Sequence, residues 1–197
     1  MKYDDYIWDL GGTLLDNYES SAQAFEESLK KFNIEVSHLD IYNALKHSTD
    51  YAIQKFASDI PNFLKIYKEV EREYLAQPVL FADAKRVLSE IVDNGGRNFM
   101  ISHRDNHVLE ILDATDIHKY FTEVVTSDNG FARKPDPQSV DYLINKYQMS
   151  NAVMIGDRLL DIKAGINAGI STIYFSNDEY LLQADQNIKS LSEILDL

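Results

Sequence analysis

The stretch YIWDLGGTLLDN, residues 6–17, joins a short apolar run to one carboxylate and a pair of glycines. Residues 6–8 have the aromatic and β-branched character of a buried strand, and Asp9 follows them directly. Gly11 and Gly12 add no side chain and cost backbone order, so they indicate a turn whose backbone approaches a ligand closely. A single acid at a buried strand end, beside such a turn, points to chemistry at that end.

Similar apolar runs recur along the chain, and each is typical of a buried strand. They comprise residues 6–8, 99–101, 124–125, 153–155 and 172–175. Segments with helical spacing lie between the later runs, one of them closed by Gly95-Gly96 and another opened by Asp136 as N-cap with Pro137 at the first helical position. A last helix is predicted from Ser190, where the pattern Ser190-x-x-Glu193 forms a capping box. The alternation predicts an α/β fold with a doubly wound parallel sheet.

Residues 17–77 interrupt this alternation because they contain no convincing strand. Ser20-x-x-Gln23 has the pattern of a capping box, and an apolar stripe with helical spacing follows Pro61. We therefore predict an α/β core made of residues 1–16 and 78–197, and a helical domain inserted at 17–77.

Composition narrows the classes of function. With 197 residues, 45% of them hydrophobic, the chain can bury a core of its own. The net charge of −13 argues against nucleic acid or an anionic membrane as partner, and a phosphorylated ligand would need a local positive site. The chain has no cysteine, no run approaching the roughly 20 apolar residues of a membrane span, and an acidic N-terminus unlike a signal peptide. We expect a cytoplasmic monomer or homodimer.

Four polar segments follow the predicted strands. Asp9 ends the first strand, Ser102 the second, Lys134 lies after the third, and Asp157 with Asp161 follows the fourth. In open parallel sheets ligands bind beyond the carboxyl ends of the strands, so these residues should meet at one edge. Taken singly, each has a purely structural alternative as a turn residue, a helix cap or a surface charge. Their joint occurrence favours a site.

Such a cluster suits phosphoryl transfer. A carboxylate such as Asp9 can attack phosphorus if a cation offsets the repulsion between the two anions, and Mg²⁺ needs only one or two carboxylates and a carbonyl for this. Asp9 and Asp157 could supply the carboxylates, and Lys134 would hold carboxylate and phosphate together. Ser102 and the backbone N–H groups of residues 11–13 would donate hydrogen bonds to the phosphate.

At this point the chain resembles the haloacid dehalogenase-like hydrolase superfamily over its whole length. The resemblance rests on four motifs in the family's order and spacing: Asp9-Leu10-Gly11-Gly12-Thr13-Leu14, Ser102, Lys134-Pro135 and Gly156-Asp157-x-x-x-Asp161. Members with a helical cap domain after the first motif are most similar, and they are mostly magnesium-dependent phosphatases of small phosphorylated metabolites. The resemblance therefore implies a Rossmann-like core, a helical cap at 17–77, Mg²⁺ as cofactor and a small phosphorylated metabolite as substrate.

The resemblance also implies a role for each matching residue. Asp9 would be the nucleophile and Lys134 the charge stabiliser. The phosphate binders would be Gly12, Thr13 and Ser102, with His103 and Arg104 as further candidates, and His103 could also act as acid and base with an ordinary pKa. Asp9, Asp157 and the backbone carbonyl of Gly11 would bind magnesium, with Asp161 in support.

One position departs from the family pattern. Phosphatases of the family carry a second aspartate two residues after the nucleophile, which protonates the leaving alcohol and then activates water, and here that position is Gly11. Its loss removes acid–base help usually worth roughly 10²- to 10⁴-fold in rate. The carbonyl of Gly11 remains, so the metal site is retained.

Relatives that lack this aspartate define the alternatives. Phosphonoacetaldehyde hydrolases resemble the chain in having a small residue there, and they form a Schiff base on a cap lysine, for which Lys46 and Lys55 are the candidates. True haloacid dehalogenases work without metal, so the retained Asp157 and Asp161 count against them. A protein that binds a phosphorylated metabolite without turnover is the third alternative.

Overall fold

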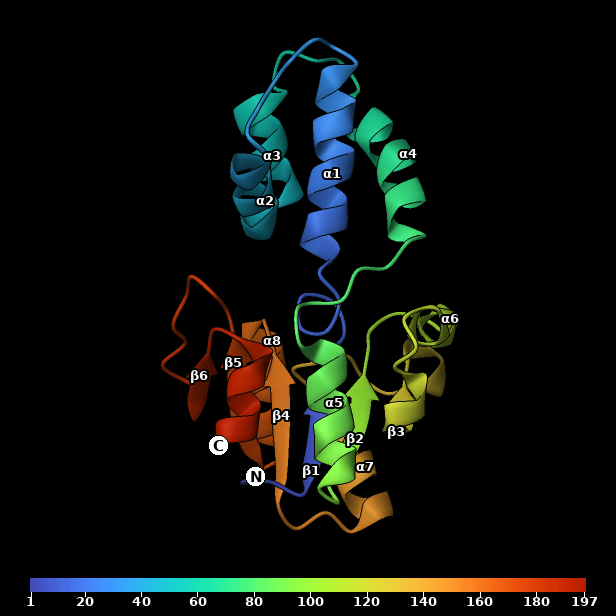
Figure 1. Ribbon diagram of the computed structural model, residues 1–197, viewed down its shortest axis with the longest axis vertical. Coiled ribbons are helices and arrows are strands. Elements are labelled where there is room, and N and C mark those ends of the chain that lie inside the picture. The colour runs from blue at the N-terminus through green and yellow to red at the C-terminus, as the bar shows by residue number, and fades with distance from the viewer. The chain divides into compact units, whose positions relative to one another are not determined.

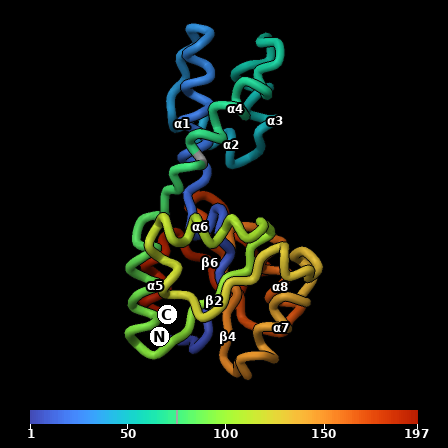
Figure 2. The backbone as a smooth tube through the Cα atoms, turned by 90° about the vertical axis from the view of Figure 1, so that its right-hand side faces the viewer, coloured from blue at the N-terminus to red at the C-terminus, as the bar shows by residue number. Residues whose placement is uncertain are grey.

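The chain folds into two compact units, which Figures 1 and 2 show as a ribbon and as a backbone tube. The computed structural model describes the backbone of residues 1–197 and every side chain except that of Leu75. The sheet unit comprises residues 1–15 and 80–197, and the helical unit comprises residues 16–79. The sequence pattern alone suggests residues 17–77 for the inserted part.

The sheet unit is built on six parallel strands in the order β3-β2-β1-β4-β5-β6, which confirms the predicted doubly wound α/β fold. Five of the strands contain the predicted apolar runs, whereas the sixth was missed because its sequence, QNI, is mostly polar. The bounds are β1 Asp5–Trp8, β2 Arg97–Ile101, β3 Phe121–Val125, β4 Ala152–Gly156, β5 Ser171–Phe175 and β6 Gln186–Ile188.

Helices cover both faces of this sheet, because successive strand residues point to opposite sides. Trp8 and Met100 pack on one face with α5 (Ala84–Asp93), α6 (His107–Ala114) and the 3₁₀-helix Leu191–Asp196. On the other face, Ile7 and Phe99 pack with α7 (Gln138–Tyr147) and α8 (Leu159–Asn167). Figure 2 shows α5 on one side of the strands and α7 and α8 on the other.

Three predicted helix ends differ from the structure. The helix α1 (Asn17–Lys30) is capped by Asp16, whose carboxylate accepts the N–H of Glu19 at 3.0 Å, so the predicted capping box at Ser20 is wrong and Ser20 lies buried inside the helix. The N-cap of α7 is Pro137 rather than Asp136, although Asp136 still accepts the N–H of Gln138. The segment after Ser190 keeps its capping box but is a 3₁₀-helix.

The helical unit contains α1, α2 (His38–His47), α3 (Thr49–Phe56) and α4 (Phe63–Leu75). Its core contains a cluster of aromatic rings, in which the ring of Phe25 lies 4.9 Å from that of Phe63 and 5.1 Å from that of Tyr67. Edge-to-face packing of this kind adds to the burial energy of the rings. Within the described part of the chain, no helix combines the length and apolar character that a membrane span requires.

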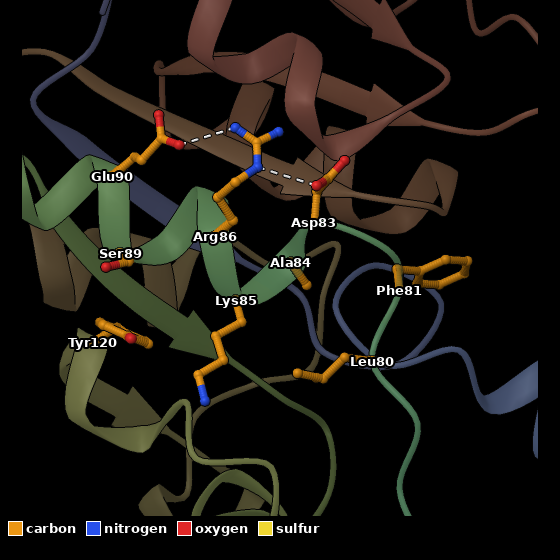
Figure 3. Close-up of a pocket in the computed structure, with 9 residues that line it drawn as sticks. All are labelled: Leu80, Phe81, Asp83, Ala84, Lys85, Arg86, Ser89, Glu90 and Tyr120. Atoms are coloured by element: carbon orange, nitrogen blue, oxygen red, sulfur yellow. Dashed lines mark hydrogen bonds and ion pairs between the residues drawn. The ribbon is translucent and has the colours of Figure 1, made fainter.

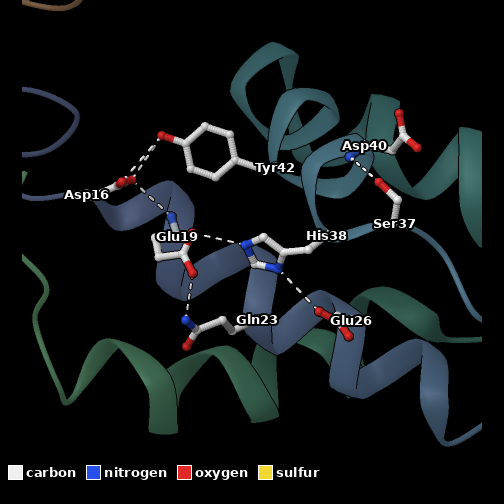
Figure 4. A network of polar contacts seen from close by, with 8 residues as sticks. All are labelled: Asp16, Glu19, Gln23, Glu26, Ser37, His38, Asp40 and Tyr42. Carbon is white, nitrogen blue, oxygen red and sulfur yellow. Dashed lines mark hydrogen bonds and ion pairs between the residues drawn. The ribbon is translucent and has the colours of Figure 1, made fainter.

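Polar contacts join α2 to α1 in this unit (Figure 4). The imidazole of His38 places Nε2 3.0 Å from Glu19 and Nδ1 3.2 Å from Glu26, so a carboxylate faces each ring nitrogen. These acids, Glu19 first, raise the pKa of His38 and favour the doubly protonated ring. Tyr42 donates to the capping carboxylate of Asp16 at 3.2 Å. The start of α1 is thus held both by its own cap and by α2.

Candidate active site

Asp9 lies at the carboxyl edge of the sheet, directly after β1. Its N–H donates to the carbonyl of Ile155 on β4 at 2.9 Å, which extends the strand pairing to the acid itself. The strand order places β2 and β4 on either side of β1, so Ser102, Asp9 and Asp157 follow three adjacent strands. The side chain of Asp9 is 15% exposed and therefore reachable by a ligand.

Lys134 is the cation at the centre of the site. Its Nζ lies 2.5 Å from Asp9 Oδ1 and 2.6 Å from Asp161 Oδ1, and it donates to the carbonyl of Ile101 at 3.1 Å. The side chain is only 1% exposed. Burial alone would lower the pKa of Lys134, but the charges of Asp9 and Asp161 outweigh it and raise the pKa. The ammonium is therefore kept charged inside the protein.

Three carboxylates lie close together beside the Lys134 ammonium. Asp9, Asp157 and Asp161 each offer an oxygen within 4.8 Å of the others. Burial first, and then the charges of Asp9 and Asp161, raise the pKa of Asp157 to about 7. Burial also raises the pKa of Asp161, although Lys134 opposes this. One lysine does not balance three acids, so a second cation is favoured among them.

The donor set fits a hard divalent cation. Asp161 Oδ2 accepts the N–H of Arg158 at 3.1 Å, whereas its buried Oδ1 lies near Lys134 Nζ without the alignment of a hydrogen bond. Asp9 Oδ2 accepts no hydrogen bond from any residue that the structure describes. Carboxylate oxygens with unused lone pairs, gathered this closely, are the ligands that Mg²⁺ prefers.

Two glycines make room for these acids. A Cβ on Gly12 would lie 2.1 Å from Asp157 Oδ2, and Gly12 also has a φ of +88°. A Cβ on Gly156 would lie 2.3 Å from the Cβ of Asp161. The acids can therefore pack against these two backbone segments only because neither residue carries a side chain.

Residues 11–13 were expected to donate their backbone N–H groups to phosphate, but two of these N–H groups bind within the loop itself. The N–H of Gly12 donates to Leu15 at 2.9 Å and that of Thr13 points to Leu10 at 3.4 Å, so neither is left for a phosphate. The Thr13 hydroxyl, expected to bind phosphate, donates to Asp157 Oδ1 at 3.2 Å. Within the described chain, only Leu10 and Gly11 in this loop keep an N–H without an acceptor.

The segment after β2 carries the other predicted phosphate ligands. The hydroxyl oxygen of Ser102 accepts the N–H of Arg104 at 3.2 Å, which leaves its hydrogen for donation, and the side chain of Arg104 is exposed. His103 Nε2 accepts the backbone N–H of Lys134 at 2.8 Å. Burial, with the charges of Lys134 and Arg133, lowers the pKa of His103 to about 4, so the expectation of an ordinary pKa is wrong. His103 is neutral at pH 7 and supports the Lys134 loop.

The candidate Schiff-base lysines lie in the helical unit. Lys46 Nζ is 5.9 Å from the centre of the Tyr42 ring on the same helix, and Lys55 is exposed, with its Nζ 4.9 Å from the centre of the Phe56 ring. Imine formation on either lysine stays a prediction.

A hollow of about 570 Å³ lies along α5 and contains none of the predicted site residues (Figure 3). Its charged groups already have partners. Arg86 pairs with Asp83 at 3.1 Å and with Glu90 at 2.9 Å, and Lys85 pairs with Asp116 at 2.6 Å. This hollow therefore offers no unpaired charged group among the residues that line it.

Comparisons with known proteins agree with this geometry. The sequence profile described as haloacid dehalogenase-like hydrolase matches residues 6–175. The chain is 27% identical to a phosphoglycolate phosphatase of Vibrio parahaemolyticus, over 96% of this chain and 93% of that protein. It is 25% identical to the pyrophosphatase PpaX of Oceanobacillus iheyensis, over 87% and 83%. The crystal structure of a hydrolase from Streptococcus pneumoniae TIGR4 is 50% identical, with a TM-score of 0.90 and 100% of both chains covered.

Replacing Gly12 tests whether its missing side chain positions Asp157. Gly12→Ala should lose the thermal stabilisation that Mg²⁺ gives the wild type, because the new Cβ displaces the Asp157 carboxylate. Gly95→Ala is the matched control, since Gly95 has a φ of +84° and no atom lies within 4 Å of the position that a Cβ would take there. Both variants should lose about 1 kcal/mol of unfolding free energy through backbone strain. A wild-type magnesium response in Gly12→Ala would contradict this assignment.

The raised pKa of Asp157 predicts how cation binding depends on pH. Below about pH 7 this carboxyl holds a proton, which a cation must displace. The affinity for Mg²⁺, measured by titration calorimetry, should be level above pH 8 and fall by about tenfold per pH unit below pH 7. Asp157→Asn should abolish both the binding and its proton release. An affinity that stays constant from pH 8 to pH 5.5 would contradict the prediction.

Proposed function

We propose that this chain, which belongs to the haloacid dehalogenase-like hydrolase family, is a magnesium-dependent phosphatase of a small phosphorylated metabolite and acts through an aspartyl-phosphate on Asp9. Its curated relatives include enzymes named phosphoglycolate phosphatase and pyrophosphatase. The observation that carries the proposal is the contact of one buried ammonium, Lys134, with both Asp9 and Asp161, inside a group of three carboxylates.

Asp9 is the nucleophile in this mechanism. Lys134 binds Oδ1 of Asp9, so Oδ2 is the oxygen that would attack phosphorus and form the new P–O bond while the bond to the leaving oxygen breaks. The leaving oxygen departs as an oxyanion, with the electron pair of the broken bond. Ser102, with its free hydroxyl hydrogen, and the N–H groups of Leu10 and Gly11 would bind the equatorial phosphate oxygens.

The second step regenerates the enzyme. Water attacks the phosphorus of the aspartyl-phosphate, inorganic phosphate leaves, and Asp9 returns as a carboxylate. Both this water and a departing alkoxide need proton transfer, for which Gly11 provides no group. Neutral His103 does not replace it, because its Nε2 is occupied by the N–H of Lys134.

Magnesium would be held by Asp9, Asp157 and the carbonyl of Gly11, with Asp161 in support. When bound, it supplies the positive charge that lets a carboxylate and a phosphate approach each other. Thr13 orients Asp157 for this purpose, and the N–H of Arg158 orients Asp161.

The identity of the leaving group should decide the rate. We expect magnesium-dependent hydrolysis of 4-nitrophenyl phosphate, whose leaving group needs no proton, and at least about 10²-fold slower hydrolysis of ethyl phosphate, because Gly11 cannot protonate an alkoxide. Steady-state release of phosphate measures both. Asp9→Asn should abolish the activity on the aryl ester, and an intact rate in that variant would refute the nucleophile.

A variant that restores the missing acid, Gly11→Asp, tests the same explanation in the opposite direction. Gly11→Asp introduces a carboxyl at a position whose φ is not positive, unlike that of Gly12. The rate on ethyl phosphate should rise by at least tenfold, with little change on the aryl ester. Ligand-induced thermal stabilisation without product, for both esters and both proteins, would instead favour a binding protein without turnover.

A further inference from the structure

Arginines are distributed unevenly over the sheet unit. Its five arginines are Arg86, Arg97, Arg104, Arg133 and Arg158. Arg86 and Arg97 are ion-paired, the latter to Asp5 at 2.6 Å. The guanidinium groups of the other three, which we call the arginine rim, are exposed and pair with no carboxylate anywhere in the described structure.

Each rim arginine adjoins a residue of the proposed active site. Arg104 lies two residues after Ser102, Arg133 immediately precedes Lys134, and Arg158 immediately follows Asp157. All three therefore lie at the carboxyl edge of the sheet, on the loops that follow β2, β3 and β4. The arginines without an ion pair in the described part of the sheet unit thus gather where an anionic substrate would bind.

Backbone hydrogen bonds fix two of the three rim positions, Arg104 and Arg158. The N–H of Arg104 donates to Ser102 Oγ at 3.2 Å, and that of Arg158 donates to Asp161 Oδ2 at 3.1 Å. The neighbouring carboxylates of Asp105 and Asp136 form no ion pair with these guanidinium groups and instead accept the backbone N–H groups of His107 and Gln138, each at 3.0 Å. The loops therefore hold the rim arginines in place without pairing their guanidinium groups.

Space for a ligand group adjoins one member of the rim, Arg158. A hollow of about 290 Å³ is lined by Pro135, Arg158, Leu159, Leu160 and Lys163, so it borders both the Lys134 loop and the start of α8. The charges of Arg133 and Arg158 also contribute to the lowered pKa of His103. In a chain of net charge −13, unpaired guanidinium groups beside the site supply local positive charge for an anion.

We propose that the arginine rim binds a second anionic group of the substrate, so that the preferred substrate class is a phosphate ester or anhydride that also carries a carboxylate or a further phosphate. The inference rests on the proposed function, because it places the first phosphate at Asp9. Guanidinium groups suit this role through their paired N–H donors, which match carboxylate and phosphate oxygens. Phosphoglycolate and pyrophosphate, named in the relatives, both belong to this class.

Two aryl esters of equal size test the inference. The probes are 4-carboxyphenyl phosphate and its neutral amide, 4-carbamoylphenyl phosphate. The wild type should prefer the carboxylate by at least tenfold in kcat/KM, and Arg104→Gln/Arg133→Gln/Arg158→Gln should bring that ratio close to one. Arg86→Gln is the control for lost arginine charge and should keep the wild-type ratio. Circular dichroism and thermal melting check that each variant is folded.

The outcomes separate the two proposals. A wild-type ratio near one, or a ratio that the triple substitution leaves unchanged, overturns the arginine rim while hydrolysis of the amide still supports the phosphatase. If neither ester is hydrolysed, the phosphatase fails, and binding then tests the rim by calorimetry with phosphonoacetate and phosphonoacetamide. Tighter binding of phosphonoacetate, lost in the triple variant and kept in Arg86→Gln, supports the rim, whereas equal binding of the two phosphonates refutes it.

Discussion

The site depends on one buried ammonium held between carboxylates. Lys134 contacts Asp9 and Asp161 while almost fully removed from solvent, and Asp157 lies within the same group. Burying a charge costs several kcal/mol unless partners compensate it, and the acids here repel one another when the lysine is absent. An arrangement this costly is typical of functional sites, where perturbed pKa values serve binding and catalysis. The same lysine leaves one oxygen of Asp9 free to react.

The order of the strands and two glycines bring these charged side chains together. Because β2, β1 and β4 are neighbours, loops more than 50 residues apart in sequence meet at one edge. Gly12 and Gly156 then allow the acids to approach the backbone more closely than any Cβ would permit. Neutral His103 completes the support by accepting the N–H of Lys134. The exposed arginines extend the positive charge outward, which a protein so acidic overall requires for an anionic substrate.

The family, the enzyme class and the parallel sheet could be predicted from the sequence, because apolar runs and motif spacing are local properties, and the comparisons and strand order confirm them. The short polar strand β6 could not, since its pairing depends on β5 and not on its own composition. The roles of Thr13 and His103 also escaped prediction, because their partners, Asp157 and Lys134, are remote in sequence. A motif thus identifies the site residues in the sequence, whereas their hydrogen-bond partners can be identified only from the folded structure.

The most direct test of the account is the pre-steady-state reaction with 4-nitrophenyl phosphate in the presence of Mg²⁺. Since Gly11 offers no group to activate water, breakdown of the aspartyl-phosphate should limit turnover. We predict a burst of about one 4-nitrophenolate per enzyme, with phosphate recovered on Asp9 after acid quenching and mass spectrometry. Steady release without a burst, and no phosphate on Asp9, would contradict the central claim.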